Sequence, residues 1–108
     1  MTLAELKTRL EAIPGFAKKV VYYAWPEGKQ PNLPFLCFFE TGAENFGADG
    51  VVYYGSPTVA IELYTKTKDP ATESLIEAAL TGGGLFFTKA EQYLGDENCW
   101  FVLYTVQL

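Results

Sequence analysis

Residues 58–80, TVAIELYTKTKDPATESLIEAAL, carry a strand signal, a charged turn and a helix signal in direct succession. In the first part Val59, Ile61 and Leu63 alternate with other side chains, and this period of two predicts a strand with one face on a core. The second part has apolar residues at helical spacing. The stretch therefore predicts a protein of mixed α and β character.

Two helices are predicted, over residues 3–13 and 70–81. The first follows Thr2 and Glu5, which have the spacing of a capping box. The second follows Asp69, whose carboxylate can accept from unpaired backbone N–H groups, and it begins with a proline, which has no N–H to leave unpaired. Both carry an apolar stripe, as expected of helices that pack on one layer of a core.

The other β-rich segments have short turns or loops between them. They cover residues 20–25, 35–41, 51–54, 85–93 and 99–106. Residues 42–50, which are rich in glycine, are predicted to form a loop. We expect residues 1–108 to form a single α+β domain, a two-layer sandwich of a mostly antiparallel sheet with both helices packed on one face. The other face would then carry many aromatic side chains.

Composition excludes several function classes. The chain has 108 residues, a net charge of −5 and no histidine. An excess of acids argues against binding nucleic acid, which depends on neutralising phosphates. Without histidine there is no Ser–His or Cys–His nucleophile. No apolar run approaches the length of a membrane span, so we expect no membrane partner and a cytoplasmic location.

Two cysteines, Cys37 and Cys99, each lie in an apolar segment that reads as a strand. Small apolar side chains in such positions are usually buried, and nothing in the sequence indicates an oxidising compartment. We therefore expect both thiols to be buried and reduced. A disulfide would require the two strands to be neighbours in register.

Three other groups of residues have features of a binding or catalytic site, but a structural role explains each of them better. Glycines 82–84 follow a helix, whereas a phosphate-binding glycine loop precedes one. Acidic and amide residues at 44, 45 and 49 do not have EF-hand spacing. Glu40 and Glu62 are candidates for a carboxylate pair across strands, but two separate exposed acids are the simpler interpretation. We predict no catalytic residue, metal or cofactor.

Four segments taken together resemble a known family. They are AWPEG at 24–28, LPF at 33–35, NFGADGVVY at 45–53 and IELYTKTKDP at 61–70. Their order and spacing are similar to those of tail-completion, or tail-terminator, proteins of long-tailed phages and prophages of Gram-positive bacteria. The resemblance covers nearly the whole chain and rests on the co-occurrence of the segments.

This resemblance implies a non-enzymatic structural subunit with a two-layer α+β fold. Such subunits form a ring, expected to be a hexamer, that caps the tail tube and joins the tail to the head. The implied partners are copies of the chain, the tail tube and head-completion proteins. The implied locations are the host cytoplasm during assembly and then the virion tail or neck. Residues 55–57, Gly-Ser-Pro, depart from the family pattern and leave open whether 51–65 is one strand or two.

Other functions remain as alternatives. In the first alternative, the chain is a different neck or head–tail connector component. In another it is a small protein-binding module that uses the aromatic sheet face or the 25–34 loop as a groove. An enzyme with a carboxylate pair is the third. Self-association separates the ring subunit from a binding module, which should stay monomeric.

The stretch 44–54 supplies the candidate interface, with Phe46, Asp49, Val51 and Tyr53 as its residues. It matches the most recognisable part of the family pattern. A single large apolar residue, Phe46, stands in a polar and glycine-rich segment. Such a residue either folds back onto the core or anchors a contact with a partner.

The variant Phe46→Ala distinguishes these two roles. If Phe46 anchors a contact, the variant keeps its melting temperature and loses about 2 kcal/mol or more of association free energy. If Phe46 is a core residue, unfolding becomes easier by about 3–5 kcal/mol. Thermal denaturation and sizing of the same sample provide both readouts. An early melt, or no change in either readout, contradicts the interface role.

Overall fold

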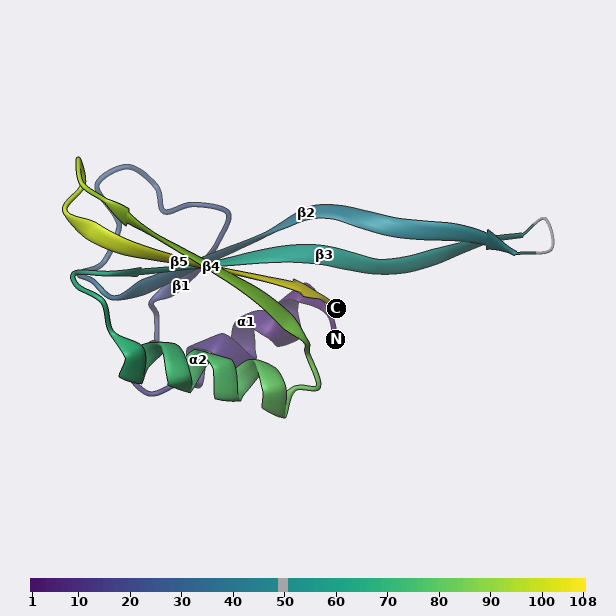
Figure 1. Ribbon diagram of the computed structural model, residues 1–108, viewed down its shortest axis with the longest axis horizontal. Helices are drawn as coiled ribbons and strands as arrows, with labels where there is room; N and C mark the ends of the chain where they lie inside the picture. The colour runs from purple at the N-terminus through teal and green to yellow at the C-terminus, as the bar shows by residue number, and fades with distance from the viewer. Residues whose placement is uncertain (49–50) are drawn as a thin grey trace.

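The computed structural model spans residues 1–108 and describes the backbone of residues 1–48 and 51–108 and the side chains of residues 1–42 and 57–108. Figure 1 shows the elements in their spatial arrangement. In chain order they are α1 (Leu3–Glu11), β1 (Val20–Tyr22), β2 (Phe35–Ala48), β3 (Val51–Thr65), α2 (Pro70–Gly82), β4 (Phe87–Leu94) and β5 (Cys99–Gln107).

The strands form a five-stranded sheet in the order β1-β2-β3-β5-β4. β1 runs parallel to β2, and the other neighbouring pairs are antiparallel. Both helices lie on the same side of the sheet (Figure 1), which we call the helix face; the opposite side is the free face. The predicted fold class, α+β with two helices on one face of a mostly antiparallel sheet, is confirmed.

β3 lies in the middle of the sheet and provides the centre of the core. Val59, Ile61 and Leu63 are fully buried, as their alternation predicts. The same cluster takes apolar side chains from both helices and from the neighbouring strands: Leu6, Leu10, Leu36, Phe38, Ile76, Leu80, Val102 and Tyr104. The sheet and the two helices therefore share one core, in which each element buries a single face.

Both predicted helix starts are confirmed. At α1 the Thr2 hydroxyl accepts from the Glu5 N–H at 3.1 Å, and the Thr2 N–H donates to Glu5 Oε1 at 3.2 Å. At α2 the Thr72 N–H donates to Asp69 Oδ1 at 3.1 Å. Hydrogen bonds from the Thr72 hydroxyl and backbone hold the pKa of Asp69 below its usual value. α1 ends at Glu11, slightly earlier than predicted.

The glycines that end α2 also allow the two helices to approach each other. Arg9 of α1 donates from Nε to the backbone oxygen of Ala79 at 2.7 Å, which also accepts from the Gly83 N–H at 3.1 Å near the end of α2. A Cβ atom on Gly83 would lie 2.8 Å from the same Nε. Gly84 has a φ of +76°, which favours glycine. These glycines serve helix termination and packing, in agreement with their structural interpretation.

The β2–β3 hairpin corrects the prediction of a loop at 42–50. β2 continues to Ala48 and pairs with β3 from Val51 onward. Glycines and small residues weaken a local strand signal, but an antiparallel partner supplies the backbone hydrogen bonds that decide the conformation. Register shifts follow Glu40 and Ala43, and such irregularities let glycine-rich sequence remain in a ladder.

β3 is one strand from Val51 to Thr65, which settles the question raised by the Gly-Ser-Pro segment. The backbone oxygen of Pro57 accepts from the Leu108 N–H at 3.0 Å, so this residue faces the β5 side. The ladder between β3 and β5 ends at the pair Thr58 and Gln107. The missing N–H of Pro57 falls where that ladder stops, and no ladder hydrogen bond is lost.

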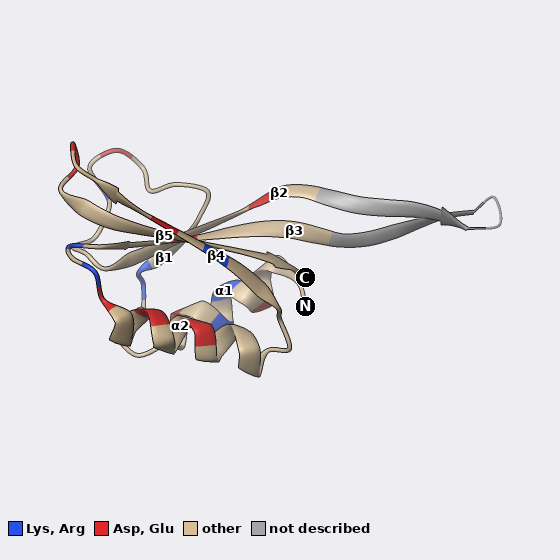
Figure 2. Ribbon diagram, in the orientation of Figure 1, with Lys and Arg blue, Asp and Glu red and all other residues tan. Residues whose placement is uncertain are grey.

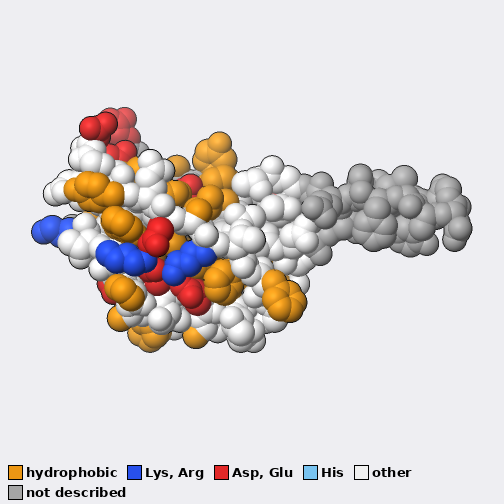
Figure 3. All heavy atoms as spheres, in the orientation of Figure 1, with side chains coloured by type: hydrophobic (Ala, Val, Ile, Leu, Met, Phe, Trp, Pro, Cys, Tyr) orange, Lys and Arg blue, Asp and Glu red, His pale blue; other side chains and the backbone are white. Residues whose placement is uncertain are grey.

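An ion-pair network joins α2 to β4 on the helix face (Figures 2 and 3). Glu73 is only 2% exposed, and its Oε1 accepts from Lys68 Nζ at 2.8 Å and from Lys89 Nζ at 2.7 Å. Glu77 Oε2 accepts from Lys89 Nζ and from the Tyr104 hydroxyl, each at 2.8 Å. The hydrogen bonds to Glu73 and Glu77 raise the pKa of Lys89. The buried Glu73 charge is thereby compensated by cations.

Two neighbouring residues of α2 test the packing arrangement. Ile76 is fully buried, whereas Leu75 is 43% exposed on the other side of the same helix. We expect Ile76→Ala to lower the free energy of unfolding by about 2–5 kcal/mol, because it leaves a cavity in the core. Leu75→Ala, the matched control, should change it by no more than about 0.5 kcal/mol. Urea denaturation measures both values. Similar losses for the two variants would contradict the placement of α2.

Candidate binding cleft on the free face of the sheet

The free face carries a row of aromatic side chains, as predicted. The ring centroids of Phe35 on β2 and Tyr64 on β3 lie 5.2 Å apart, and those of Tyr64 and Phe101 on β5 also lie 5.2 Å apart. These three residues are directly opposite one another in the strand registers. Trp25 extends the row with a ring 6.2 Å from Phe35. The row therefore crosses three strands and continues onto the 25–34 segment.

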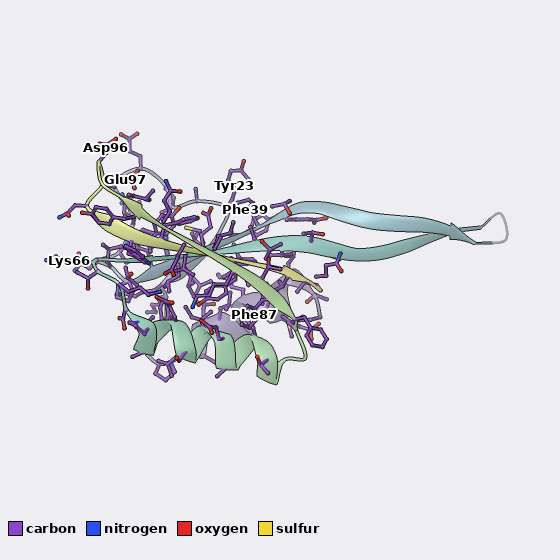
Figure 4. All side chains as sticks on the ribbon, in the orientation of Figure 1. Tyr23, Phe39, Lys66, Phe87, Asp96 and Glu97 are labelled. Carbon is purple, nitrogen blue, oxygen red and sulfur yellow. The ribbon has the colours of Figure 1, made fainter. Side chains whose placement is uncertain are left out.

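The 25–34 segment and the sheet enclose a cleft of about 860 Å³. In Figure 4 the labelled Tyr23, Phe39, Asp96 and Glu97 lie on this side of the sheet, away from the helices. The residues that line the cleft come from residues 23–33, from the free face, from the position just after β3 and from the turn before β5: Tyr23, Ala24, Trp25, Gln30, Pro31, Asn32, Leu33, Phe35, Cys37, Glu62, Tyr64, Lys66, Glu97 and Cys99. Aromatic walls thus combine with a few polar groups, the composition typical of a binding site.

Glu62 is the acidic residue of this cleft that lies within the sheet. It is half-buried on β3 between Cys37 on β2 and Leu103 on β5. Its Oε1 accepts a hydrogen bond from the Tyr64 hydroxyl at 3.1 Å. Burial raises the pKa of the Glu62 carboxyl and outweighs the opposing effect of that hydrogen bond. The charged form of Glu62 is therefore less stable here than in water.

Cys37 and Cys99 are buried and not bonded to each other, as predicted. Both line the cleft, but β3 lies between their strands. Two strand spacings amount to about 9–10 Å, which is beyond the reach of a disulfide. Burial and the Glu62 charge raise the pKa of the Cys37 thiol to about 11, so it is protonated near neutral pH and a poor nucleophile.

The predicted interface residues are only partly covered by the structure. Phe46 and Tyr53 are opposite each other in the β2–β3 ladder, and Val51 is opposite Ala48. The side chains of Phe46, Val51 and Tyr53, and the whole of Asp49, lie outside the described residues. Their role at an interface stays a prediction.

Glu40 and Glu62 do not form a carboxylate pair, so the interpretation as two separate acids is confirmed, although Glu62 is half-buried and not exposed. Glu40 is opposite Val59 and Glu62 is opposite Cys37 in the β2–β3 register. Since alternate residues of a strand point to opposite faces, Glu40 shares the side of Leu36 and Phe38, and Glu62 lies on the free face. The two carboxylates are therefore not placed for general acid–base work on one substrate.

Two exposed sheet edges were not identified from the sequence. β4 is exposed along most of its length, and Phe86, immediately before it, is 95% exposed. At the opposite edge, β1 is followed by Tyr23, which is 70% exposed. The adjacent pair of phenylalanines at 86 and 87 was a usable signal, because a strand that alternates can bury only one of two neighbours. Phe87 packs against the core and Phe86 does not.

Comparisons with known proteins leave the chain without a family assignment. No protein-family model matches the sequence, and no curated protein matches it. Neither helix of the described chain has the length and apolar character needed to cross a membrane.

The raised pKa of Glu62 predicts a pH-dependent effect of the variant Glu62→Gln. As the pH rises from the ordinary Glu pKa of 4.5 through the raised value, the unfolded chain releases its proton before the folded one, so stability falls. Glutamine cannot ionise and keeps an acceptor for the Tyr64 hydroxyl. We expect the variant to melt a few degrees above the wild type at pH 7 and close to it at pH 4.

The control is Glu27→Gln, an exposed acid of the 25–34 segment that does not line the cleft. Melting curves of both variants across this pH range provide the comparison. A Glu62→Gln variant that is less stable than the wild type at pH 7 would show that the Glu62 charge is favourable in the folded chain.

Proposed function

We propose that this chain is a non-enzymatic structural subunit of a phage or prophage tail, which forms a ring that caps the tail tube and joins it to the head. The resemblance of four ordered segments to tail-terminator proteins supports the proposal. The two-layer α+β fold is the fold that this resemblance implies. The proposed partners are further copies of the chain, the tail tube and head-completion proteins.

The observation that carries the proposal is the pair of exposed and unlike sheet edges. One edge is β1, which has three residues and ends at Tyr22, whose side chain is 48% exposed. The other is the longer β4, which is preceded by the 95% exposed Phe86 and has Tyr93 near its end. Exposed strand edges with large apolar residues are surfaces that natural proteins usually cover.

Unlike edges favour head-to-tail association. A two-fold dimer uses the same patch on both copies, whereas contact between two different patches leaves one of each free for the next copy. Repetition then closes into a ring or continues as a filament, depending on the rotation between neighbours. The hexamer implied by the family resemblance is one such closed ring.

A second candidate function is a small protein-binding module. The specific observation in its favour is the aromatic cleft beneath the 25–34 segment, which is separate from the two sheet edges. Both functions can belong to one chain, because a ring subunit also contacts proteins of the tail and head.

The variant Phe86→Ala tests whether the β4 edge mediates assembly. Because Phe86 is 95% exposed, we expect no change in the melting temperature of the isolated chain. If Phe86 anchors the contact, association weakens by about 2 kcal/mol or more. Leu75→Ala, at an exposed leucine of α2, is the matched control and should assemble like the wild type. Sedimentation velocity over a range of concentrations, with negative-stain images with and without tail tubes, measures assembly.

Two outcomes would count against this function. A wild-type chain that stays monomeric at all concentrations and leaves tail tubes uncapped removes the ring proposal altogether. A Phe86→Ala variant that assembles like the wild type shows that the contact does not use the β4 edge.

A further inference from the structure

The half-buried Glu62 carboxylate has no lysine paired with it among the described side chains, whereas the buried Glu73 carboxylate has two. Glu73 is held between Lys68 and Lys89 at hydrogen-bonding distance. Among the side chains of residues 1–42 and 57–108, none of the ion pairs involves Glu62, although Lys66 lines the same cleft. A half-buried acid without a cation is an unfavourable arrangement, unless a ligand supplies the charge.

Trp25 provides a second polar group without a partner at the same cleft. Its indole Nε1–H is buried, and the described part of the chain offers it no acceptor. A buried donor without an acceptor costs free energy, so a small movement of the Trp25 ring that brings its N–H to an acceptor in the cleft would be favourable. The other tryptophan differs, since Trp100 Nε1 donates to Glu91 Oε2 at 3.2 Å.

The surroundings of these two groups suit a positively charged ligand. The rings of Trp25, Phe35 and Tyr64 form a wall of the cleft, and aromatic faces attract ammonium and guanidinium groups. Of the charged residues that line the cleft, Glu62 and Glu97 are acidic and only Lys66 is basic. The whole chain carries a net charge of −5. An anionic ligand would meet repulsion at the Glu62 carboxylate.

The size and the rim of the cleft favour a peptide over a small amine. A volume of about 860 Å³ accommodates more than one side chain. The exposed amides of Gln30 and Asn32 at the rim can bond to the backbone of a bound segment. A peptide also carries carbonyl groups, which a simple amine lacks, and the Trp25 indole N–H requires such an acceptor.

We propose that this cleft binds an extended segment of a partner protein through a lysine or arginine side chain, whose cation pairs with Glu62 between the aromatic walls. A small movement of the Trp25 ring exposes its indole N–H to the cleft, where a backbone carbonyl of the same segment accepts from it. The inference depends only on the cleft, and it holds whether or not the chain forms a ring. It differs from the edge contacts proposed above in both surface and chemistry.

The test is an NMR titration with short peptides on the ¹⁵N-labelled chain at a concentration where it is monomeric. The probe is acetyl-Gly-Lys-Gly-amide, and the matched ligand is the same peptide with an acetylated lysine, which has no charge. The two indole N–H signals provide an internal comparison, because Trp25 lines the cleft and Trp100 does not. We expect the lysine peptide to shift the Trp25 signal saturably, with a Kd of about 1 mM, and to leave the Trp100 signal in place.

Variants separate the Glu62 contribution from general electrostatic attraction. Glu62→Gln should weaken binding of the lysine peptide about tenfold or more, because a charge-assisted hydrogen bond is lost. Glu27→Gln removes the same charge from outside the cleft and should bind like the wild type. The ¹⁵N spectrum of each variant shows whether it is folded.

Three outcomes would overturn the inference. The first is no saturable shift of the Trp25 signal with the lysine peptide. The second is equal binding of the charged and acetylated peptides, or equal binding by wild type and Glu62→Gln. The third is tighter binding of spermidine than of the peptide, which would assign the cleft to free polyamines. None of these results bears on ring assembly, which sedimentation measures separately.

Discussion

The structure depends on the alternation of side chains along β3, the middle strand of the sheet. Val59, Ile61 and Leu63 are fully buried against the helices. Because successive side chains of a strand point to opposite faces, the same geometry places Glu62 and Tyr64 on the free face. A shift of one residue in register would exchange the two sets and bury a carboxylate in the apolar core. The core and the cleft are thus two results of one constraint.

A sheet with helices on one side only leaves its other side to be covered by something else. Here the 25–34 segment covers part of the free face, and the aromatic row from Trp25 to Phe101 fills the space beneath and beside it. A loop cannot exclude water as fully as a packed layer of helices. The result is a cleft with apolar walls, and not a second core.

The buried Glu73 carboxylate and the half-buried Glu62 carboxylate differ in their partners. Glu73 connects α2 to β4 through two lysines, and its charge is compensated inside the fold. Glu62 receives one hydrogen bond from Tyr64, and burial raises its pKa. Lysines neutralise the charge of Glu73, and a lysine beside Glu62 could neutralise that charge in the same way. Among the described residues Glu62 has no cation beside it, and carboxylates of this kind are commonly retained at functional sites.

The sequence by itself determined the features that depend on nearby residues. The Thr2 and Glu5 capping box, the Asp69–Pro70 helix start and the period of two at 59–63 are local signals, and each leads to the predicted element. Only the tertiary structure decided the features that depend on partners distant in the chain. Residues 42–48 become a strand because β3 pairs with them, and Glu40 and Glu62 are separated by the strand register. Phe86, immediately before the edge strand β4, is exposed because no described element packs over it, and the cleft exists because the 25–34 segment folds over β2 and β3. Local patterns report which face a residue takes within its own element, whereas the order of strands in the sheet determines what lies against that face.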